Sequence, residues 1–270
     1  MRLKDKVAIV TGASSGLGRA IAALFAEEGA KVVVNAYKNV AGGEETVQQI
    51  RDAGGEAVLC VASVASEEGA QALTQAAVDN WGRVDILVNN AGIEIRGGVL
   101  TLTSEEWDTM LGVDLKGIFL CSKFAAPEMI KVGGGSIVNV TSVLGLGVIP
   151  ERAAYCAAKA GAIHLSKSMA LDLAQHNIRS NALVPGAFLT PLLEQSMIDS
   201  GDYEGTKEVL TNKSVFCRMG EHRELVDAVG PFGAEELRAF TPAVLSGFSA
   251  EKRNIERAEL QDTVRTELAD

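Results

Sequence analysis

Tyr155 and Lys159 have the side-chain types and the spacing for proton transfer to an oxygen atom. They lie four residues apart in a segment with a helical pattern, so both side chains project from one helix face. A tyrosine hydroxyl has an ordinary pKa of about 10, and a nearby ammonium group lowers it. A tyrosine tuned in this way can exchange a proton with an alcohol or carbonyl oxygen. Because such pairs are common by chance, the prediction depends on what accompanies them.

Ser142 follows a short apolar run at residues 136–140, thirteen residues before Tyr155. The run has the pattern of a buried strand. Ligands of open α/β sheets bind at the carboxyl ends of strands, and Ser142 would lie at such an end. The sequence therefore places a hydroxyl group at the edge where a ligand is expected.

The segment Thr11–Gly18 is rich in glycine and lies between a predicted strand and a predicted helix. Glycines there allow a sharp turn and a close approach to a pyrophosphate, whose oxygens meet the unpaired N–H groups of the helix. We expect a dinucleotide to contact Gly12, Ser14, Ser15, Gly16, Leu17 and Gly18. The spacing Gly-x3-Gly-x-Gly differs from the usual G-x-G-x-x-G, and the alternative is a glycine turn without a ligand.

The end of the second predicted strand is the usual place to distinguish NAD(H) from NADP(H). An acidic residue there would bind the ribose hydroxyl and repel a phosphate, but this chain has neutral Asn35, followed by Tyr37 and Lys38. Ser15 in the glycine loop is not basic, so a second phosphate ligand is missing. This pattern slightly favours NADP(H), or the use of both cofactors. A preference for NAD(H), with Lys38 as a solvated loop residue, remains the alternative.

Strand-like and helix-like segments alternate along the chain. Strands are expected at residues 7–10, 31–35, 57–61, 85–88, 136–140 and 178–184. Helices are expected at residues 19–28, 43–53, 66–80, 104–130 and 152–176. The alternation predicts an α/β fold, a single Rossmann-like, doubly wound parallel sheet with helices on both faces.

Composition excludes several classes of partner. The 270-residue chain has a net charge of −10, which disfavours nucleic acid and anionic membrane surfaces. No apolar run approaches the length of a membrane span. The four cysteines form no CxxC pair or His/Cys cluster, so we expect reduced thiols, a cytoplasmic location and no metal site.

Together these residues resemble the classical short-chain dehydrogenase/reductase (SDR) family. The matching motifs are Thr11-Gly12-x3-Gly16-x-Gly18, Asn89-Asn90-Ala91-Gly92, Ser142, Tyr155-x3-Lys159, Asn181-x3-Pro185-Gly186 and Thr190-Pro191. The resemblance covers residues 5 to about 228. Within the family, the chain looks most like the glucose 1-dehydrogenase and 3-oxoacyl-carrier-protein reductase group.

The resemblance implies an NAD(P)-dependent oxidoreductase. A hydride would pass between nicotinamide and a secondary alcohol or ketone, such as a sugar or a 3-oxoacyl substrate. Tyr155 would be the general acid/base, Lys159 would bind the nicotinamide ribose and lower the pKa of Tyr155, and Ser142 would bind the substrate oxygen. Further cofactor contacts would come from Ser63, Val64, Asn90, Ala91, Gly92, Pro185, Gly186 and Thr190. The family also implies a homo-oligomer, a dimer or tetramer.

Two departures from the family pattern concern the site. Asp114 stands where the family usually has an asparagine that supports a water relay towards the lysine. A carboxylate near Lys159 would partly cancel the effect of that lysine on Tyr155, which predicts weakened catalysis. Ser63 replaces an aspartate that usually contacts the adenine. The alternative function is therefore a catalytically weak nucleotide-binding scaffold or sensor on the same fold.

The C-terminal residues depart from the family most. We expect an SDR domain over residues 1–250, atypical after residue 229, and a charged helical or frayed tail at 251–270. Residues 242–248 are a degraded form of the family's final strand, so the sequence leaves open whether that strand is formed, poorly formed or absent. The family uses this region to form tetramers, which leaves the choice between dimer and tetramer open.

Three segments bear on the substrate. Glu94 and Glu151 flank the predicted site, and either could reach a polar substrate or lie in solvent. Residues 187–215 are predicted to form a mobile lid, whose Leu192, Leu193 and Met197 shape the pocket or only pack. The largely apolar run at 143–151 favours a less polar substrate.

Overall fold

Short runs of valine, isoleucine and alanine form the strands of one parallel sheet. The computed structural model describes residues 1–213, 218–222, 224 and 244–247. The strands are β1 (Val7–Val10), β2 (Lys31–Ala36), β3 (Glu56–Val61), β4 (Ile86–Asn89), β5 (Gly135–Val140), β6 (Ile178–Pro185) and β7 (Val244–Gly247). They form a seven-stranded sheet in the order β3-β2-β1-β4-β5-β6-β7. The predicted α/β class and doubly wound topology are therefore confirmed.

Both faces of the central strands are buried, as continuous apolar runs require. Ala8 and Val10 of β1 belong to one core, and Val7 and Ile9 of the same strand belong to the other. The first core includes Ile21 and Phe25 from α1 (Gly16–Glu27), and Val47 and Ile50 from α2 (Val40–Asp52). The second includes Leu73 from α3 (Glu67–Trp81), and Leu120 and Met129 from α5 (Gly117–Lys131).

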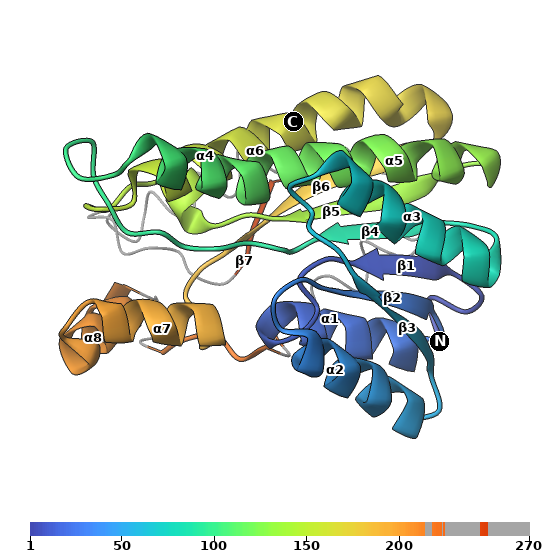
Figure 1. Ribbon diagram of the computed structural model, residues 1–270, viewed down its shortest axis with the longest axis horizontal. Helices are drawn as coiled ribbons and strands as arrows, with labels where there is room; N and C mark the ends of the chain where they lie inside the picture. Colours follow the sequence, from blue (N-terminus) through green and yellow to red (C-terminus); the bar gives the residue numbers. More distant parts are fainter. Residues whose placement is uncertain (214–217, 223, 225–243, 248–270) are drawn as a thin grey trace, which may run out of the picture.

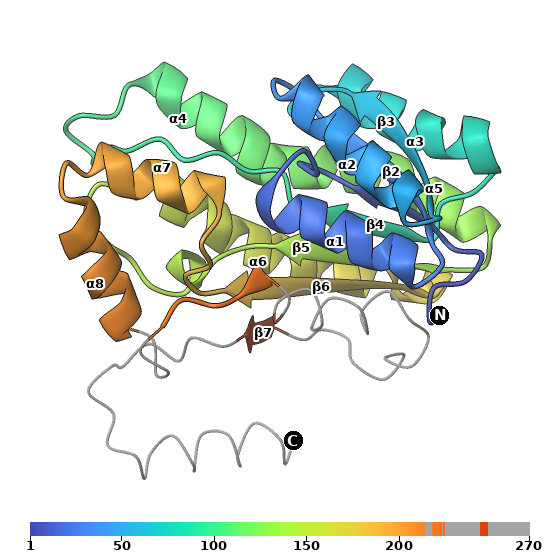
Figure 2. The same cartoon turned by 90° about the horizontal axis from the view of Figure 1, so that it is seen from below.

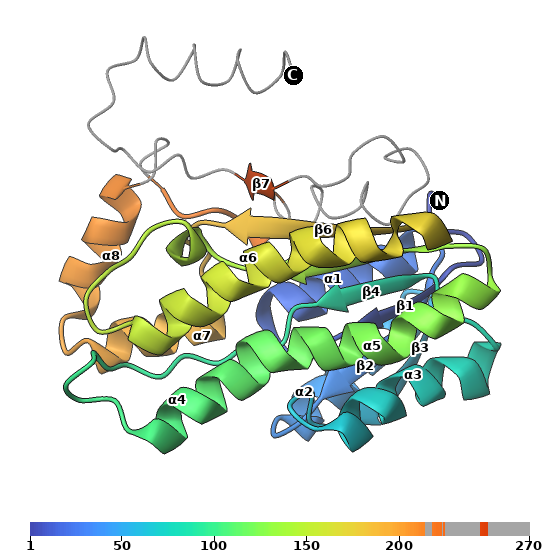
Figure 3. The same ribbon diagram turned by 90° about the horizontal axis from the view of Figure 1, so that it is seen from above.

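The helices accordingly form two layers. α1 and α2 cover one face of the sheet, and α3, α5 and α6 (Ala153–Leu173) cover the other (Figure 1, Figure 3). A 3-10 turn at Ala174–His176 extends α6 to the end predicted for this helix. The face that carries α6 also presents Tyr155 and Lys159 from the first two turns of that helix. Their position therefore depends on how α6 packs against the sheet.

The helical segment predicted at 104–130 is interrupted by a π-helical turn. α4 (Ser104–Leu111) leads into the π turn Gly112–Lys116, and α5 follows without a break. A π turn inserts an extra residue into the helix and is frequent at functional sites. Asp114 lies in this turn and is completely buried.

The segment after β6 forms two helices at the carboxyl ends of the strands. These helices are α7 (Pro191–Asp199) and α8 (Tyr203–Lys213), which lie beyond the sheet in Figure 1 and Figure 2. Thr190 caps α7 by accepting a hydrogen bond from the Leu193 N–H, and Pro191 occupies the first turn. Within the predicted lid at 187–215, the described residues up to 213 thus include two helices at the ligand-binding edge of the sheet.

A short final strand is present, which the sequence had left open. β7 pairs in parallel with β6, with Val244 opposite Ala182 and Gly247 opposite Pro185. Strand pairing is made by backbone groups, so a sequence that departs from the family's final motif can still complete the sheet. The predicted tail at 251–270 lies outside the described residues.

Candidate functional site

A cavity of about 390 Å³ opens at the carboxyl ends of the strands. It lies where the strand order reverses between β1 and β4, which is where open α/β sheets bind ligands. Most of the residues predicted from the sequence line it. These are Gly12, Ser14, Ser15, Gly16, Leu17, Gly18, Asn90, Ala91, Gly92, Ser142, Tyr155, Lys159, Pro185, Gly186 and Thr190.

The glycine loop needs its glycines for two different reasons. Gly12 and Gly16 have φ values of 61° and 54°, a region that residues with side chains rarely adopt. Gly18 has no room for a Cβ atom, which would collide with the Gly12 carbonyl oxygen and the Asn90 side-chain nitrogen. The loop thus turns tightly and packs directly on the segment after β4.

The N-terminus of α1 is open towards the cavity. Ser15 is its N-cap residue, but its side chain makes no capping hydrogen bond, and no acidic residue occupies the first turn. The first N–H groups of a helix need partners and attract anions. A pyrophosphate fits this arrangement, because the cradle has no Cβ atoms in the way and offers N–H donors.

Thr11 and Asn90 hold the loop in place. The Thr11 Oγ1 atom accepts hydrogen bonds from the N–H groups of Asn90 at 2.9 Å and Ala91 at 3.0 Å. In return, the Asn90 Nδ2 atom donates to the carbonyl oxygens of Thr11 at 3.0 Å and Gly12 at 3.2 Å. The Asn-Asn-Ala-Gly motif therefore has a structural role at the loop in addition to lining the cavity.

Asn35 lies beneath this loop, and its amide is occupied within the protein. Its Oδ1 atom accepts a hydrogen bond from the Gly12 N–H at 3.1 Å, and its Nδ2 atom donates to the Ala62 carbonyl at 2.9 Å. The side chain is 2% exposed and does not line the cavity. Lys38, Ser63, Val64 and Asp114, also predicted at the site, do not line it either.

Tyr155, Lys159 and Ser142 meet at the centre of the cavity. The Lys159 Nζ atom lies 5.4 Å from the centre of the Tyr155 ring, one helical turn away. Ser142 follows β5 and lines the same cavity, and its Oγ atom accepts a hydrogen bond from the Leu144 N–H at 3.2 Å. The structure thus assembles the three side chains that sequence spacing selected.

Asp114 lies behind this group, against Lys159. The Asp114 Oδ2 atom is 3.0 Å from the Lys159 Nζ atom, and Oδ1 accepts a hydrogen bond from the Ile93 N–H at 2.9 Å. A Cβ atom at Gly92 would lie 3.0 Å from Oδ2, which is a tight contact, so the carboxylate packs closely against this glycine. The predicted proximity of this carboxylate to Lys159 is therefore present.

The pKa values of Asp114, Lys159 and Tyr155 all lie above their ordinary values, for different reasons. Burial raises the pKa of Asp114, and Lys159 offsets only part of this effect. Burial would lower the pKa of Lys159, but Asp114 and Tyr155 outweigh it and the pKa lies above its usual value. Burial also raises the pKa of Tyr155; Lys159 and the Ser142 hydrogen bond lower it, while Asp114 and Glu94 raise it further.

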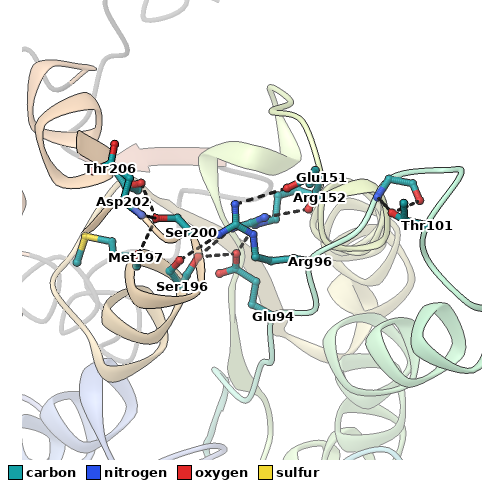
Figure 4. Close-up of polar contacts among 11 residues, drawn as sticks. Glu94, Arg96, Thr101, Glu151, Arg152, Ser196, Met197, Ser200, Asp202 and Thr206 are labelled. Atoms are coloured by element: carbon teal, nitrogen blue, oxygen red, sulfur yellow. Dashed lines mark hydrogen bonds and ion pairs between the residues drawn. The ribbon is translucent and has the colours of Figure 1, made fainter. Parts of the chain in front are cut away.

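A second polar group lines the cavity and was only partly foreseen. Glu94 forms an ion pair with Arg152, and the Ser196 hydroxyl of α7 hydrogen-bonds with both (Figure 4). Sequence reasoning singled out Glu94 but missed Arg152 and Ser196. Arg152 immediately precedes the helix that carries Tyr155, and this position could have indicated it. Glu151 does not line the cavity; its side chain is 62% exposed and pairs with Arg96.

The predicted lid residues divide between the cavity and the core. Leu192, Leu193 and Ser196 of α7 line the cavity, together with Leu210 of α8. Met197 is fully buried and does not line it. In the apolar run at 143–151, Val143, Leu144 and Ile149 line the cavity, whereas Val148 is 81% exposed.

Three further features of the described residues concern metal ions, disulfides and membranes. Within them, no cluster of three or more His, Cys, Asp or Glu side chains could hold a metal ion. Cys60, Cys121 and Cys156 are free thiols. None of the helices in the described part of the chain is long and apolar enough to cross a membrane.

Comparison with known proteins shows one consistent family. A short-chain dehydrogenase family model matches residues 6–200. An uncharacterized oxidoreductase from Thermotoga maritima is 37% identical over 91% of this chain and 97% of its own length. A 3-oxoacyl-acyl-carrier-protein reductase from the same organism is 34% identical over the same shares of the two chains. A crystal structure described as a short-chain dehydrogenase/reductase from Burkholderia xenovorans has a TM-score of 0.85 and 35% identity, covering 91% of this chain and 97% of that one.

Proposed function

Since this chain belongs to the short-chain dehydrogenase/reductase family, we propose that it is an NAD(P)-dependent oxidoreductase acting on a secondary alcohol or ketone. One observation carries the proposal: the Ser142, Tyr155 and Lys159 side chains share a cavity with an open, glycine-rich helix N-terminus. The first group can exchange a proton with a substrate oxygen. The second suits the pyrophosphate of a dinucleotide.

The cofactor would lie along the cavity from the glycine loop to the carboxyl end of β6. Gly12 to Gly18 would hold the pyrophosphate, and Asn90 and Gly92 would line the ribose side. Lys159 would bind the nicotinamide ribose, and Pro185, Gly186 and Thr190 would hold the nicotinamide. When bound, the nicotinamide supplies hydride chemistry, while the protein orients it and controls the proton.

Tyr155 would transfer the proton to or from the substrate oxygen. Ser142 lines the same cavity as Tyr155, so a substrate oxygen that meets both hydroxyls would be held in one position. The Lys159 ammonium favours the phenolate that accepts a proton from an alcohol. Asp114 would hold Lys159 in place, at the cost of a higher pKa for Tyr155.

Residues after β2 would determine the preference for NADP(H) or NAD(H). Asn35 is neutral, so it adds no negative charge that would repel a phosphate. Its amide is already hydrogen-bonded within the protein and is not available to the cofactor. Tyr37, which is 60% exposed, and Lys38 follow the strand at the surface. A lysine there attracts a ribose phosphate, so we propose a slight preference for NADP(H) or the use of both cofactors.

The proposal extends to assembly and location. The family commonly forms oligomers, so a homodimer or homotetramer is proposed. The free thiols of Cys60, Cys121 and Cys156 support a reducing compartment, which corresponds to the cytoplasm.

The buried Asp114–Lys159 pair favours a second candidate function. The Asp114 carboxylate opposes the lowering of the Tyr155 pKa by Lys159. A weakly catalytic nucleotide-binding scaffold or sensor would tolerate this opposition. The two candidates differ in turnover and agree in cofactor binding.

The variant Tyr155→Phe distinguishes the two candidate functions. We expect the variant to lose at least about a hundred-fold in turnover, the usual contribution of a general acid/base, with cofactor affinity within about two-fold of the parent. Turnover would be followed by nicotinamide absorbance, and affinity by quenching of protein fluorescence. Tyr203→Phe on α8 is the matched control and should retain full turnover. Equal turnover by the parent and Tyr155→Phe would exclude Tyr155 as the acid/base.

A further inference from the structure

Glu94, Arg152 and Ser196 form a polar triad on the wall of the catalytic cavity. Glu94 follows β4, Arg152 immediately precedes α6, and Ser196 comes from α7 (Figure 4). Three segments far apart in sequence thus deliver one charge of each sign and a hydroxyl to the same point. The proposed proton transfer uses none of them.

The contacts fix these side chains firmly. Arg152 is 6% exposed; besides its ion pair with Glu94, its Nη2 atom donates to the Ser196 Oγ atom at 2.9 Å and its Nη1 atom donates to the Glu151 carbonyl at 2.9 Å. The Ser196 hydroxyl donates to the Glu94 Oε1 atom at 2.9 Å. Glu94, Arg152 and Ser196 all line the cavity, so a carboxylate, a guanidinium and a hydroxyl are present together at its wall.

The triad lines the same cavity as Tyr155. Arg152 is the residue just before α6, and Tyr155 lies in the first turn of that helix. Glu94 also acts on Tyr155: after burial, which is the main cause, it contributes to the raised pKa of that side chain. A substrate whose oxygen meets the Tyr155 hydroxyl would therefore share its cavity with the triad.

The charges determine which group the triad accepts. Glu94 already neutralises Arg152, so a substrate carboxylate would meet a like charge and a substrate ammonium would meet the guanidinium. A hydroxyl group is neutral and both donates and accepts hydrogen bonds, so it can donate a hydrogen bond to Glu94 and accept one from Arg152. Hydrogen bonds to charged partners are stronger than those between neutral groups.

We propose that the Glu94–Arg152–Ser196 triad binds a second hydroxyl group of the substrate. The substrate class is then a neutral, polyhydroxylated alcohol or ketone, and neither a hydroxy acid nor an unsubstituted acyl chain. The inference rests on the proposed oxidoreductase function and specifies the substrate for the same cavity.

A matched series of ring alcohols tests the inference. The series is cyclohexanol, the cyclohexanediols with the second hydroxyl on the adjacent or the next carbon, and the hydroxycyclohexanecarboxylates with a carboxylate at those positions. Binding to the enzyme saturated with NAD⁺ or NADP⁺ is measured by calorimetry, and kcat/KM by nicotinamide absorbance. We expect at least one diol to exceed cyclohexanol about ten-fold, and the hydroxy acids to fall below cyclohexanol.

Variants identify the residues responsible. Glu94→Gln should reduce the preference for the diol over cyclohexanol about ten-fold and raise the affinity for the hydroxy acid, because Arg152 loses its counter-charge. Ser196→Ala should reduce the diol preference without improving the hydroxy acid, and it avoids leaving a buried charge unpaired. Glu151→Gln, whose side chain points to solvent, is the control and should match the parent.

The outcomes distinguish a failure of the triad inference from a failure of the proposed function. Binding of the diols no tighter than cyclohexanol, or a diol preference unchanged in Glu94→Gln and Ser196→Ala, overturns the triad inference even if turnover is intact. Failure of every nicotinamide cofactor to bind, or equal turnover by Tyr155→Phe, overturns the proposed function instead.

Discussion

Asp114 is the residue whose chemistry most distinguishes this site. Its carboxylate is fully buried in the π turn before α5 and pairs with Lys159 at 3.0 Å. Removing one partner of a buried ion pair normally destabilises a protein because the remaining charge is uncompensated. An amide at this position would still reach Lys159 but would add no negative charge near Tyr155.

Asp114→Asn is expected to shift the pH dependence of alcohol oxidation. In the proposed mechanism, oxidation needs the deprotonated form of Tyr155, so activity would rise as the pH passes through the pKa of this group. That pKa is raised chiefly by burial and further by Asp114. Without the carboxylate the pKa should fall, and the ascending limb of kcat/KM against pH should move to lower pH.

Asp79→Asn on the exposed surface of α3 is the control for a general charge effect, and its profile should coincide with that of the parent. An unmoved limb in Asp114→Asn would mean that Asp114 does not influence the titration of Tyr155.

At the scale of elements, the strand–loop–helix unit from β1 to α1 positions the proposed cofactor. The loop turns through Gly12 and Gly16, and Gly18 allows α1 to pack against the Gly12 carbonyl and Asn90. The helix then presents its uncapped N-terminus to the cavity. A side chain at Gly18 would push these parts away from each other.

Gly18→Ala is expected to lower both stability and cofactor affinity. Overpacking costs about 1–3 kcal/mol, which exceeds the gain of about 1 kcal/mol from replacing a helical glycine. The loop must also shift, so the Kd for the cofactor should rise about ten-fold or more. Urea unfolding and fluorescence titration measure the two effects.

Gly98→Ala is the matched control, because a Cβ atom at Gly98 would contact nothing within 4 Å. Its cofactor affinity should be unchanged. Parental affinity in Gly18→Ala would show that the cofactor does not depend on this close approach.

At the scale of the whole molecule, cofactor binding should stabilise the folded state. The sheet brings β1, β4, β5 and β6 to one cavity, so a ligand there contacts segments across most of the fold. A ligand at about 100 times its Kd adds roughly 2.7 kcal/mol to the free energy of unfolding. For a domain of this size, that corresponds to a rise in Tm of about 5–10 °C.

We expect thermal unfolding with NAD⁺, NADH, NADP⁺ and NADPH to show this rise, with NADPH at least as effective as NADH. Lys38→Ala should reduce the shift with NADPH more than the shift with NADH. Lys131→Ala, at the end of α5 and away from the cavity, should change neither shift. A cooperative transition that no cofactor moves would contradict the dinucleotide site.

The sequence by itself determined the fold class, most strand positions and the central site residues. These features depend on local patterns: continuous apolar runs form buried strands, glycines permit the loop, and a spacing of four places Tyr155 and Lys159 on one helix face. Ser142 could be added because the carboxyl ends of parallel strands meet at one edge.

Only the tertiary structure decided which polar groups face each other. Arg152, Ser196 and Glu94 are distant in sequence, and their meeting depends on how α7 lies over the sheet. Asn35 proved to be buried beneath the glycine loop, because its amide satisfies backbone groups of two neighbouring strands and the loop. The final strand likewise formed through backbone pairing with β6, which side-chain patterns do not encode. Local signals predict elements, whereas contacts between elements depend on the packing of the whole chain.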